Sequence, residues 1–388
     1  MSNRLIEDRT SALAWTEIDR TVMTRARELA RLGAGRTGPN PIVGAVVVKD
    51  GDVVATGFHR EQDDTHAEVV ALDRAGELAR GATLYVTLEP CAHQGRTPPC
   101  IDRILRSGVA RVVCPSIDPD ARVRGRGVAA LRANGVHVDV GCQADACILD
   151  ALPFFHDRLG YSSTVTLKMA VSSDGMVARA PGRRDDVTSE EARRDVHALR
   201  AMHDAIVIGI ETLLIDGPRL DCRFLPNGVD RDPVPVVLDT HARTPLDTVW
   251  SREGREFIVV CSTEAETTRL DALSRVGARI VRVRESACGL DVSETVRALA
   301  AERRSRILVE GGPNVFKSFV HAGQWDALWL YRSPRAFGPA GVPLFTSPLE
   351  SISGRVVDDT AIGEDRRVGS VNDARWSAMV EALASVRS

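Results

Sequence analysis

The chain contains 388 residues, of which 27% are charged and 44% are hydrophobic, and its formal net charge is −3 at pH 7. This length provides room for about two to three domains, each with its own core. The net charge is too small to indicate nucleic-acid binding, and the longest apolar run, Ile42 to Val48, is too short to cross a bilayer.

The N-terminal segment and the cysteines indicate the compartment. Residues 1–18 include Glu7, Asp8 and Glu17 and lack the apolar segment of a signal peptide, so we interpret them as an N-terminal extension. The eight cysteines have no regular spacing outside one block, which favours a reducing compartment and hence the cytoplasm. We expect a small-molecule substrate and neither a nucleic-acid nor a membrane partner, and we leave a homo-oligomer open.

The apolar pattern predicts a first domain over residues 19–158 in which strands and helices alternate. Val22, Ala26 and Leu29 have helical spacing, and the turn at 49–52 predicts a hairpin between two short strands. The expected helices cover 18–32, 65–78, 101–106 and 126–133, and the expected strands cover 43–48, 53–57, 84–88, 109–114 and 136–140. This alternation favours a mostly parallel sheet with helices on both faces.

One imidazole and two thiols of this domain have the residue types and order of a zinc site. His66, Cys91 and Cys100 provide three ligands and leave a fourth tetrahedral position for water, as in catalytic zinc sites. Glu68 follows His66 by two residues, so it would lie beside the metal, where a proton shuttle is needed. Considered separately, the histidine fits a solvated turn and the cysteines fit a core. Thr65 and Glu68 also match a capping box, so a structural role is the alternative for Glu68.

The cysteine block resembles that of one enzyme family. Zinc nucleobase deaminases carry H-x-E followed by P-C-x-x-C, whereas eight residues separate Cys91 from Cys100 here. The run P-C-A-H-Q-G-R-T-P-P-C, which ends at Cys100, resembles the deaminase half of the bifunctional riboflavin-biosynthesis deaminase/reductase family. The resemblance implies a cytidine-deaminase-like three-layer α/β/α domain that binds Zn²⁺ through His66, Cys91 and Cys100, with Glu68 as the catalytic residue.

Further residues of the first domain are candidates for substrate binding. Asn40 lies in a P-N-P-x-V-G motif that the family shares, and the resemblance makes it a substrate contact; a turn asparagine is the alternative. An arginine and a histidine between two metal ligands can hold a phosphorylated or polar substituent, and a glycine lets the backbone approach it. A solvated loop is the alternative for each of these loop residues. The candidates are Asn40, His59, His93, Gly95, Arg96 and Thr97.

A second α/β domain is expected over residues 159–388. Thr188 and Glu191 match a capping box at the start of its first helix. The expected strands cover 165–170, 205–210, 235–238, 257–261, 280–283, 307–309 and 327–331, and the expected helices cover 190–202, 264–276, 293–304 and 314–322. The alternation of these elements again favours a sheet covered by helices.

Two glycines connect a strand of the second domain to a helix. Gly311 and Gly312 would let backbone N–H groups approach a pyrophosphate, whose charge a helix N-terminus favours. A tight turn is the alternative. The run V-E-G-G resembles the NADPH-dependent reductase domain of the same family, which has a dihydrofolate-reductase-like α/β fold. By this resemblance the substrate residues are Lys168, Arg200, Leu220, Arg223 and Glu310, and the NADPH residues are Thr212, Asp216, Gly311, Gly312, Pro313, Asn314, Val315, Phe316, Lys317 and Ser318.

The second domain departs from the family pattern at four positions. Ser173, Gly217 and Arg184 stand where the family usually has leucine, aspartate and serine, and Asp186 replaces a tryptophan. The last change removes an aromatic wall near the cofactor and introduces a carboxylate near anionic groups, which Arg184 would offset. These changes raise the question of whether the reductase half keeps its activity or its usual substrate.

We therefore compare four hypotheses. The leading one is a bifunctional enzyme of riboflavin synthesis: zinc-dependent hydrolytic deamination of 2,5-diamino-6-(5-phosphoribosylamino)pyrimidin-4-one, followed by NADPH-dependent reduction of the ribosyl group to ribityl. The near alternative is a pathway-specific paralogue that keeps deamination but has a drifted or inactive reductase domain. The others are a nucleic-acid-editing deaminase and a non-catalytic binding module.

Overall fold

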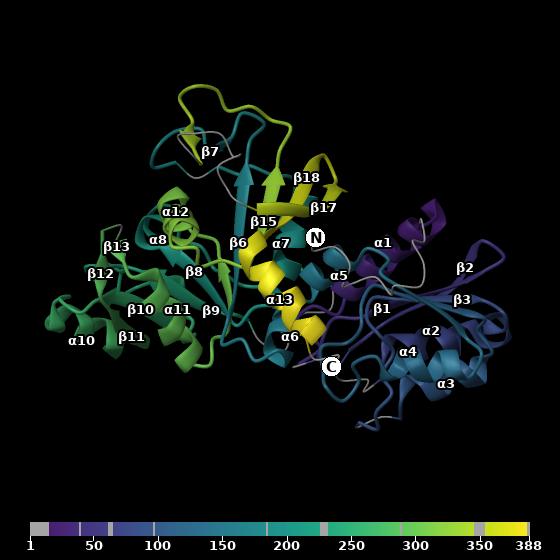
Figure 1. The fold of residues 1–388 in the computed structure, drawn as a ribbon. Helices are drawn as coiled ribbons and strands as arrows, with labels where there is room; N and C mark the ends of the chain where they lie inside the picture. Colours follow the sequence, from purple (N-terminus) through teal and green to yellow (C-terminus); the bar gives the residue numbers. More distant parts are fainter. Residues whose placement is uncertain are drawn as a thin grey trace. The chain divides into compact units, whose positions relative to one another are not determined.

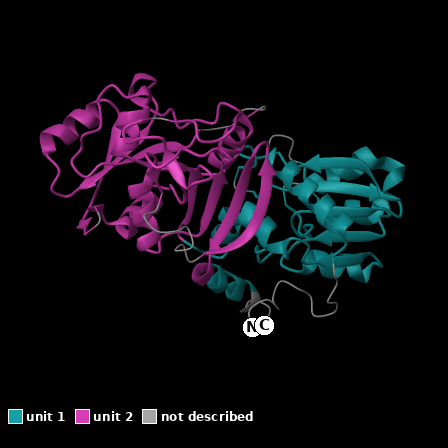
Figure 2. Ribbon diagram, turned by 90° about the horizontal axis from the view of Figure 1, so that it is seen from above, with its two compact units in different colours: residues 1–161, 376–388 teal, residues 162–375 magenta. Residues whose placement is uncertain are grey.

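The structure is a computed structural model, and it describes residues 15–38, 40–60, 65–95, 98–183, 185–225, 232–287, 289–344 and 354–385. The chain divides into two compact units, coloured separately in Figure 2: unit 1 contains residues 1–161 and 376–388, and unit 2 contains residues 162–375. The expected boundary between residues 158 and 159 lies close to this division. The helix that ends the described chain is grouped mainly with unit 1.

Unit 1 is built on a five-stranded sheet in the order β2-β1-β3-β4-β5. Its strands β1, β2 and β3 are labelled in Figure 1. The strands are β1 (Gly44–Lys49), β2 (Asp52–Phe58), β3 (Thr83–Val86), β4 (Arg111–Cys114) and β5 (His137–Val140). β3, β4 and β5 are parallel, but β1 pairs antiparallel with both β2 and β3. The sheet is therefore mixed rather than mostly parallel, because the hairpin at its edge reverses β2 against β1.

Helices cover both faces of this sheet, as expected. Since successive side chains of a strand point to opposite faces, Val47 packs in a cluster with Leu72 of one helix, while Val46 packs in another with Met23. The helices are α1 (Glu17–Arg31), α2 (Ala67–Ala75), α3 (Cys100–Ser107), α4 (Arg126–Ala133), α5 (Ala144–Asp150) and α6 (Leu152–Arg158). The expected three-layer α/β/α architecture is confirmed.

Unit 2 contains a nine-stranded sheet in the order β11-β10-β9-β8-β14-β6-β15-β18-β17. It is parallel from β11 to β15, and the last two strands are antiparallel. The strands are β6 (Thr164–Val171), β8 (Ala205–Gly209), β9 (Val234–Leu238), β10 (Phe257–Ser262), β11 (Ala278–Val283), β14 (Arg306–Val309), β15 (Ala327–Arg332), β17 (Gly354–Ile362) and β18 (Asp365–Asn372). Short pairs, β7 (Met176–Ala178) with β16 (Val342–Pro343) and β12 (Glu285–Ser286) with β13 (Gly289–Leu290), lie outside it.

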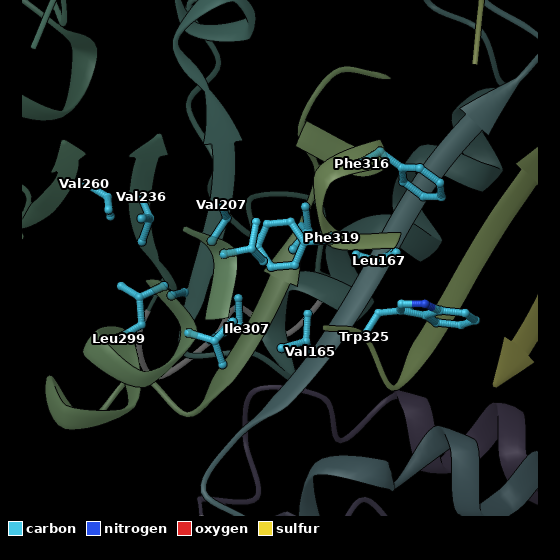
Figure 3. Packing of buried hydrophobic residues seen from close by; sticks show 14 of the residues in the cluster. Val165, Leu167, Val207, Val236, Val260, Leu299, Ile307, Phe316, Phe319 and Trp325 are labelled. Atoms are coloured by element: carbon cyan, nitrogen blue, oxygen red, sulfur yellow. The ribbon is translucent and has the colours of Figure 1, made fainter. Parts of the chain in front are cut away.

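The core of unit 2 joins this sheet to its helices. Val165, Val207 and Ile307 come from neighbouring parallel strands and pack with Phe316 and Phe319 of one helix (Figure 3). The helices of unit 2 are α7 (Glu190–Ala201), α8 (Ile210–Asp216), α9 (Val249–Arg252), α10 (Thr267–Arg275), α11 (Val292–Ala301) and α12 (Pro313–His321). The helix α13 (Asp373–Ser385) follows β18 and belongs mainly to unit 1. Within the described ranges, no helix is both long enough and apolar enough to cross a membrane.

The two predicted capping boxes are wrong. His66, not Thr65, is the N-cap of α2, and its side chain makes no capping hydrogen bond. Glu68 therefore does not form the capping box that was predicted with Thr65. Ser189, not Thr188, caps α7: its hydroxyl accepts from the backbone N–H of Ala192. In both cases the helix begins one residue later than the box requires.

Candidate active sites

The three expected zinc ligands converge in unit 1. His66 Nδ1, Cys91 Sγ and Cys100 Sγ all lie within 4.8 Å of one another. The imidazole nitrogen is 3.0 Å from the Cys100 sulfur and 3.4 Å from the Cys91 sulfur. Ligands of one tetrahedral zinc are separated by roughly 3.5–3.8 Å, given bond lengths near 2.0 and 2.3 Å. The donor set and its spacing therefore fit a single zinc ion.

Local structure explains why these atoms meet. His66 precedes α2 and Cys100 is the first residue of α3, so two helix N-termini point toward the cluster. Cys91 follows the end of β3 through Glu89 and Pro90, and no helix begins there. The backbone N–H of Cys100 donates to the Cys91 sulfur over 3.3 Å. Helix N-termini and N–H donors both favour thiolates, which are the form that binds metal.

The two thiols differ in acidity. A hydrogen bond with the Cys100 thiol lowers the pKa of Cys91, although burial opposes this shift, and His66 adds to the lowering. The same hydrogen bond, together with burial, raises the pKa of Cys100. The metal-free pair therefore holds one proton tightly, and metal binding has to release it.

Glu68 lies beside the three donors and is only 4% exposed. Burial raises the pKa of its carboxyl, while the neighbouring His66 and a hydrogen bond with Cys100 act in the opposite direction. The side chain therefore lies next to the ligands, as the spacing from His66 predicted. A buried carboxyl that faces a metal site can hold and deliver protons.

Glu89 fixes the chain just before the first cysteine, a role that sequence reasoning missed. Its carboxylate accepts four backbone N–H groups over 2.8–3.1 Å, those of Asp118, Gly125, Gly127 and Val128. A Cβ atom on Gly127 would lie 2.0 Å from the carbonyl oxygen of Pro90. The strand end that carries Cys91 is thus clamped against the start of α4.

A cavity of about 260 Å³ opens beside this cluster, and both His66 and Glu68 line it. Among the predicted substrate residues, Asn40, His59, His93 and Gly95 also line it. His59 Nδ1 donates to Thr65 O over 3.0 Å, and the His59 ring meets the His66 ring edge-on at 5.4 Å. Arg96 and Thr97 lie outside the described residues.

The cavity also has walls that were not predicted as site residues. Asp118 and Asp120, in the loop after β4, contribute carboxyl groups, and α6 contributes Phe154 and Arg158. Burial raises the pKa of Asp118 to about 7. Asp120 is ion-paired with Arg122 at 2.7 Å and with Arg158 at 3.2 Å. The two acidic residues after β4 were a sequence signal for these carboxyl groups, but the sequence did not show that they would line the cavity.

The predicted substrate residues of unit 2 form a charged cluster. Arg200 of α7 binds Glu310 through two hydrogen bonds of 2.6 and 2.9 Å and donates to Asp221 O over 3.1 Å. Burial alone would raise the pKa of Glu310, but Arg200 and Lys168 lower it to about 2. Burial lowers the pKa of Lys168, and Glu310 partly offsets this effect. Arg223 forms an ion pair with the carboxylate of Asp221. Asp221 was not predicted as a site residue.

The other predicted residues of unit 2 differ in their burial and in their contacts. Thr212 Oγ1 accepts the backbone N–H of Gly312 over 3.2 Å, which joins α8 to the start of α12. That helix begins with Pro313 and has no side-chain cap, so its first N–H groups suit an anionic ligand. Phe316, in contrast, is a fully buried core side chain, and Leu220 is only 2% exposed. Any ligand contact by Phe316 would have to use its backbone.

The rest of the predicted cofactor stretch surrounds this helix start. Asn314 is exposed, and Val315, Lys317 and Ser318 are half-buried. The hydroxyl of Ser318 donates to Val315 O over 2.8 Å. Asp216 ends α8, one turn beyond Thr212.

The departures from the family pattern have local structural roles. Gly217 ends α8 with a positive φ of 50°, a conformation that favours glycine over aspartate. The carboxylate of Asp186 lies 3.8 Å from the guanidinium of Arg193. The backbone N–H of Ser173 donates to Arg335 O. Arg184, expected to offset Asp186, lies outside the described residues.

Comparison with known families matches both halves of the chain. Residues 16–116 match the cytidine and deoxycytidylate deaminase zinc-binding region, and residues 163–365 match the RibD C-terminal domain. The riboflavin biosynthesis protein RibD of Aquifex aeolicus is 39% identical over 83% of this chain and 88% of its own length. The RibD protein of Escherichia coli is 37% identical over 86% of this chain and 93% of its own length.

Solved structures give the same result. RibD of Acinetobacter baumannii is similar with a TM-score of 0.61 and 31% identity, over 92% of this chain and 99% of that one. A diaminohydroxyphosphoribosylaminopyrimidine deaminase/5-amino-6-(5-phosphoribosylamino)uracil reductase of Thermotoga maritima has a TM-score of 0.63 and 33% identity, over 91% of this chain and 98% of that one. In both comparisons the similarity extends across the two units.

Proposed function

We propose residue roles for the two sites from one premise: this chain belongs to the RibD family, in which a zinc-binding deaminase domain and a reductase domain share one polypeptide. It is a bifunctional deaminase/reductase of riboflavin biosynthesis that uses zinc and NADPH and acts on a small-molecule pyrimidine. The alternative of a deaminase with a drifted reductase domain is not favoured, because the similarity covers both domains.

The proposed substrates follow from the name of the Thermotoga protein and from the charges of the two sites. We assign to unit 1 the hydrolytic deamination of 2,5-diamino-6-(5-phosphoribosylamino)pyrimidin-4-one, and to unit 2 the reduction of the ribosyl group of the deaminated product. The cationic cluster of Lys168, Arg200 and Arg223 supports an anionic substrate for unit 2.

In unit 1, His66, Cys91 and Cys100 hold the zinc and Glu68 moves protons. When bound, zinc supplies the acidification of water, whose pKa falls toward 7. Glu68 takes the proton of the attacking water at its carboxylate and passes it to the ring nitrogen. It then takes the remaining hydroxyl proton of the substrate adduct and delivers it to the amino group, which leaves as ammonia while the ring carbon becomes a carbonyl. Its burial next to Cys100 keeps the carboxyl within reach of the reacting atoms and away from bulk water. Asn40, His59, His93 and Gly95 bind and orient the ring from the cavity walls.

When bound in unit 2, NADPH would supply the hydride that reduces C1 of the ribose. The N-terminus of α12, from Gly311 to Ser318, and Thr212 and Asp216 of α8 hold the cofactor. The uncapped start of α12 supports this assignment, because its free N–H groups suit a pyrophosphate. Lys168, Arg200, Leu220, Arg223 and Glu310 bind the ribotide and exclude water around the sugar.

The observation that carries the deaminase assignment is the approach of one imidazole and two thiols to within 4.8 Å beside a buried carboxyl. The test supplies the diaminopyrimidine ribotide to the purified zinc-loaded chain, with and without NADPH. Ammonia release reports on unit 1, and loss of nicotinamide absorbance reports on unit 2. Ammonia release without NADPH oxidation, once the deaminated product is supplied, would restore the drifted-reductase alternative.

The variant Glu68→Gln tests the proton role. It keeps the size of the side chain but removes its basicity, so we expect deamination to fall roughly 100- to 10,000-fold while zinc content stays unchanged. Glu77→Gln is the matched control, because Glu77 is an exposed carboxylate in the same segment of unit 1. Full deaminase activity of Glu68→Gln would exclude the assignment.

Self-association into a homo-oligomer and a cytoplasmic location remain predictions. Sedimentation velocity of the zinc-loaded chain measures the first, and a single boundary at the monomer mass over a wide concentration range would contradict it. Fractionation of the source cells measures the second.

A further inference from the structure

His197 of α7 is a buried histidine with an unused hydrogen-bonding atom. It is only 4% exposed, and its Nδ1 is buried and has no hydrogen-bond partner among the described residues. Leaving a buried polar atom unpaired costs about 1–3 kcal/mol. Such an atom in a native fold calls for an explanation, and a bound ligand is one.

The surroundings of this imidazole are those of the substrate cluster. His197 and Arg200 are three residues apart on α7, so they share a face of the helix. The His197 ring meets the ring of Phe224 edge-on at 4.7 Å, and the guanidinium of Arg223 lies 4.9 Å from the centre of that same ring. Phe224 therefore connects the imidazole to a second predicted substrate residue.

The charges around His197 favour an anion. Burial, together with the cations Arg200 and Arg223, lowers the pKa of His197 to about 4, against the opposite effect of Asp221 and Glu310. The imidazole is thus neutral at pH 7 and lies in a positive field. Of the four charged groups that act on His197, the cations Arg200 and Arg223 have larger effects than the carboxylates Asp221 and Glu310.

A second buried histidine of unit 2 shows what a structural imidazole looks like. His203 is 7% exposed, and both of its ring nitrogens have partners: Nδ1 with Leu199 O at 2.8 Å and Nε2 with Thr166 Oγ1 at 2.9 Å. Within the described ranges, the histidines with a buried, unpartnered ring nitrogen are His197 and His93. His93 lines the cavity of unit 1, so each candidate active site contains one such imidazole.

We propose that His197 is a substrate-binding residue of the reductase site, where its imidazole hydrogen-bonds the phosphate group of the phosphoribosyl substrate beside Arg200 and Arg223. This inference rests on the proposed function of unit 2 and adds a residue to it. Arg200 already gives three N–H groups to Glu310 and Asp221, so a phosphate with several acceptor oxygens needs further donors. A neutral imidazole supplies one N–H donor, and the bound dianion would favour its protonated form with two.

Two variants of the full-length, zinc-loaded chain test this role. His197→Phe keeps a flat ring against Phe224 but removes both nitrogens, and His197→Gln keeps a donor and an acceptor. The readouts are the reductase KM for the deaminated ribotide, the reductase kcat, and the inhibition constant of inorganic phosphate. Deaminase activity of the same preparation, which belongs to unit 1, reports on intact protein.

We expect His197→Phe to raise both the KM for the ribotide and the inhibition constant of phosphate by roughly 10- to 100-fold, the loss typical of a hydrogen bond to a charged group. The kcat should change much less, and His197→Gln should recover part of the affinity. The thermal midpoint of His197→Phe should not fall, because an unpaired buried nitrogen is replaced by carbon.

Other outcomes separate the alternatives. An unchanged KM for the ribotide, or an unchanged phosphate inhibition constant, would overturn the proposal. A lower thermal midpoint with unchanged KM would assign His197 to packing alone. A wild-type chain that does not reduce the ribotide at all would instead contradict the proposed function, so the two failures are distinguishable.

Discussion

The two candidate sites are assembled in different ways. In unit 1, the three zinc ligands and Glu68 come from one stretch between His66 and Cys100, and the ends of one strand and two helices bring them together. In unit 2, the cluster draws on residues from Lys168 to Glu310, carried by elements far apart in the sequence. A short motif specifies the first site, and the sheet topology specifies the second.

The topology of unit 2 explains how distant residues meet. Strands β8, β14 and β6 are neighbours and parallel, so their carboxyl ends lie at one edge of the sheet. Glu310 follows β14, and Thr212 lies in the helix that follows β8. Ligands of open parallel sheets bind at this edge. The metal site should therefore fail when one ligand is lost, whereas the dispersed site should respond to changes in its charge balance.

Removal of one zinc ligand gives the largest expected effect. Cys100→Ala should lose zinc and reduce deamination at least about 1,000-fold, since the zinc is what acidifies the attacking water. Metal analysis and ammonia release measure the two consequences. Cys114→Ala is the matched control, because Cys114 is a buried thiol of the same core outside the metal cluster. Reduction of already deaminated substrate should stay normal in both variants; zinc retained by Cys100→Ala would contradict the ligand assignment.

Neutralising one charge of unit 2 is the next largest change. Glu310→Gln leaves Arg200 and Lys168 without their shared counter-charge, and breaking a buried pair costs about 3–5 kcal/mol. We expect reductase kcat/KM to fall about 100-fold while deamination is unaffected. Glu256→Gln is the control, because its pair with Arg304 at 2.8 Å leaves Glu256 half-exposed. Equal effects of the two variants would refute the idea that unit 2 depends on this charge balance.

A backbone contact tests how far the short motif of unit 1 depends on its surroundings. Gly127→Ala would place a Cβ 2.0 Å from Pro90 O, and two backbones cannot easily separate there. We expect a loss of about 1–3 kcal/mol of unfolding free energy and weaker deamination. Thermal unfolding and ammonia release measure both. Ala129→Ser, at an exposed position of the same helix, is the control and should change neither stability nor deamination appreciably. If Gly127→Ala also left both unchanged, the contact that Glu89 holds between the end of β3 and α4 would be dispensable.

Sequence reasoning located the elements whose patterns are local. The apolar spacing of α1 and α4 and the hairpin of β1 and β2 depend on neighbours in the chain, and these elements appear where they were expected. The ligand triad was predictable for the same reason. Its two cysteines, however, needed the family resemblance, because their separation departs from the general deaminase signature.

The remaining features depend on contacts between distant residues. The partners of Glu89 are backbone N–H groups of a loop beyond β4, which no residue pattern marks. The Nδ1 atom of His197 is unpaired because folding buries it without a hydrogen-bond partner among the described residues. Strand β17 contains Asp358 at a buried position where an alternating strand pattern would have an apolar residue. Asp358 is buried there because Arg367 of β18 pairs with it at 3.2 Å, so tertiary charge pairing overrides the local signal.

The smallest expected effect concerns pH, and it has opposite signs in the two units of the zinc-loaded protein. Burial lowers the pKa of His203 to about 4, so folded unit 2 keeps this ring neutral while the unfolded chain binds a proton below about pH 6.5. Stability from His203 is present above pH 6.5 and is lost as the pH falls toward 4. Between pH 7 and pH 5 this loss is about 2 kcal/mol, and His197 adds a loss of the same sign.

Asp118 of unit 1 has the reverse linkage. Burial raises its pKa to about 7, so the folded state binds a proton that the unfolded state releases above about pH 4. Acidification from pH 7 to pH 5 should therefore stabilise unit 1 by about 2 kcal/mol through this group. Hydrogen exchange of peptides from β3 and β4 and from β6 and β14 follows each unit separately. Asp118→Asn should remove the gain of unit 1 and His203→Gln should reduce the loss of unit 2; parallel trends in both units would contradict these opposite linkages.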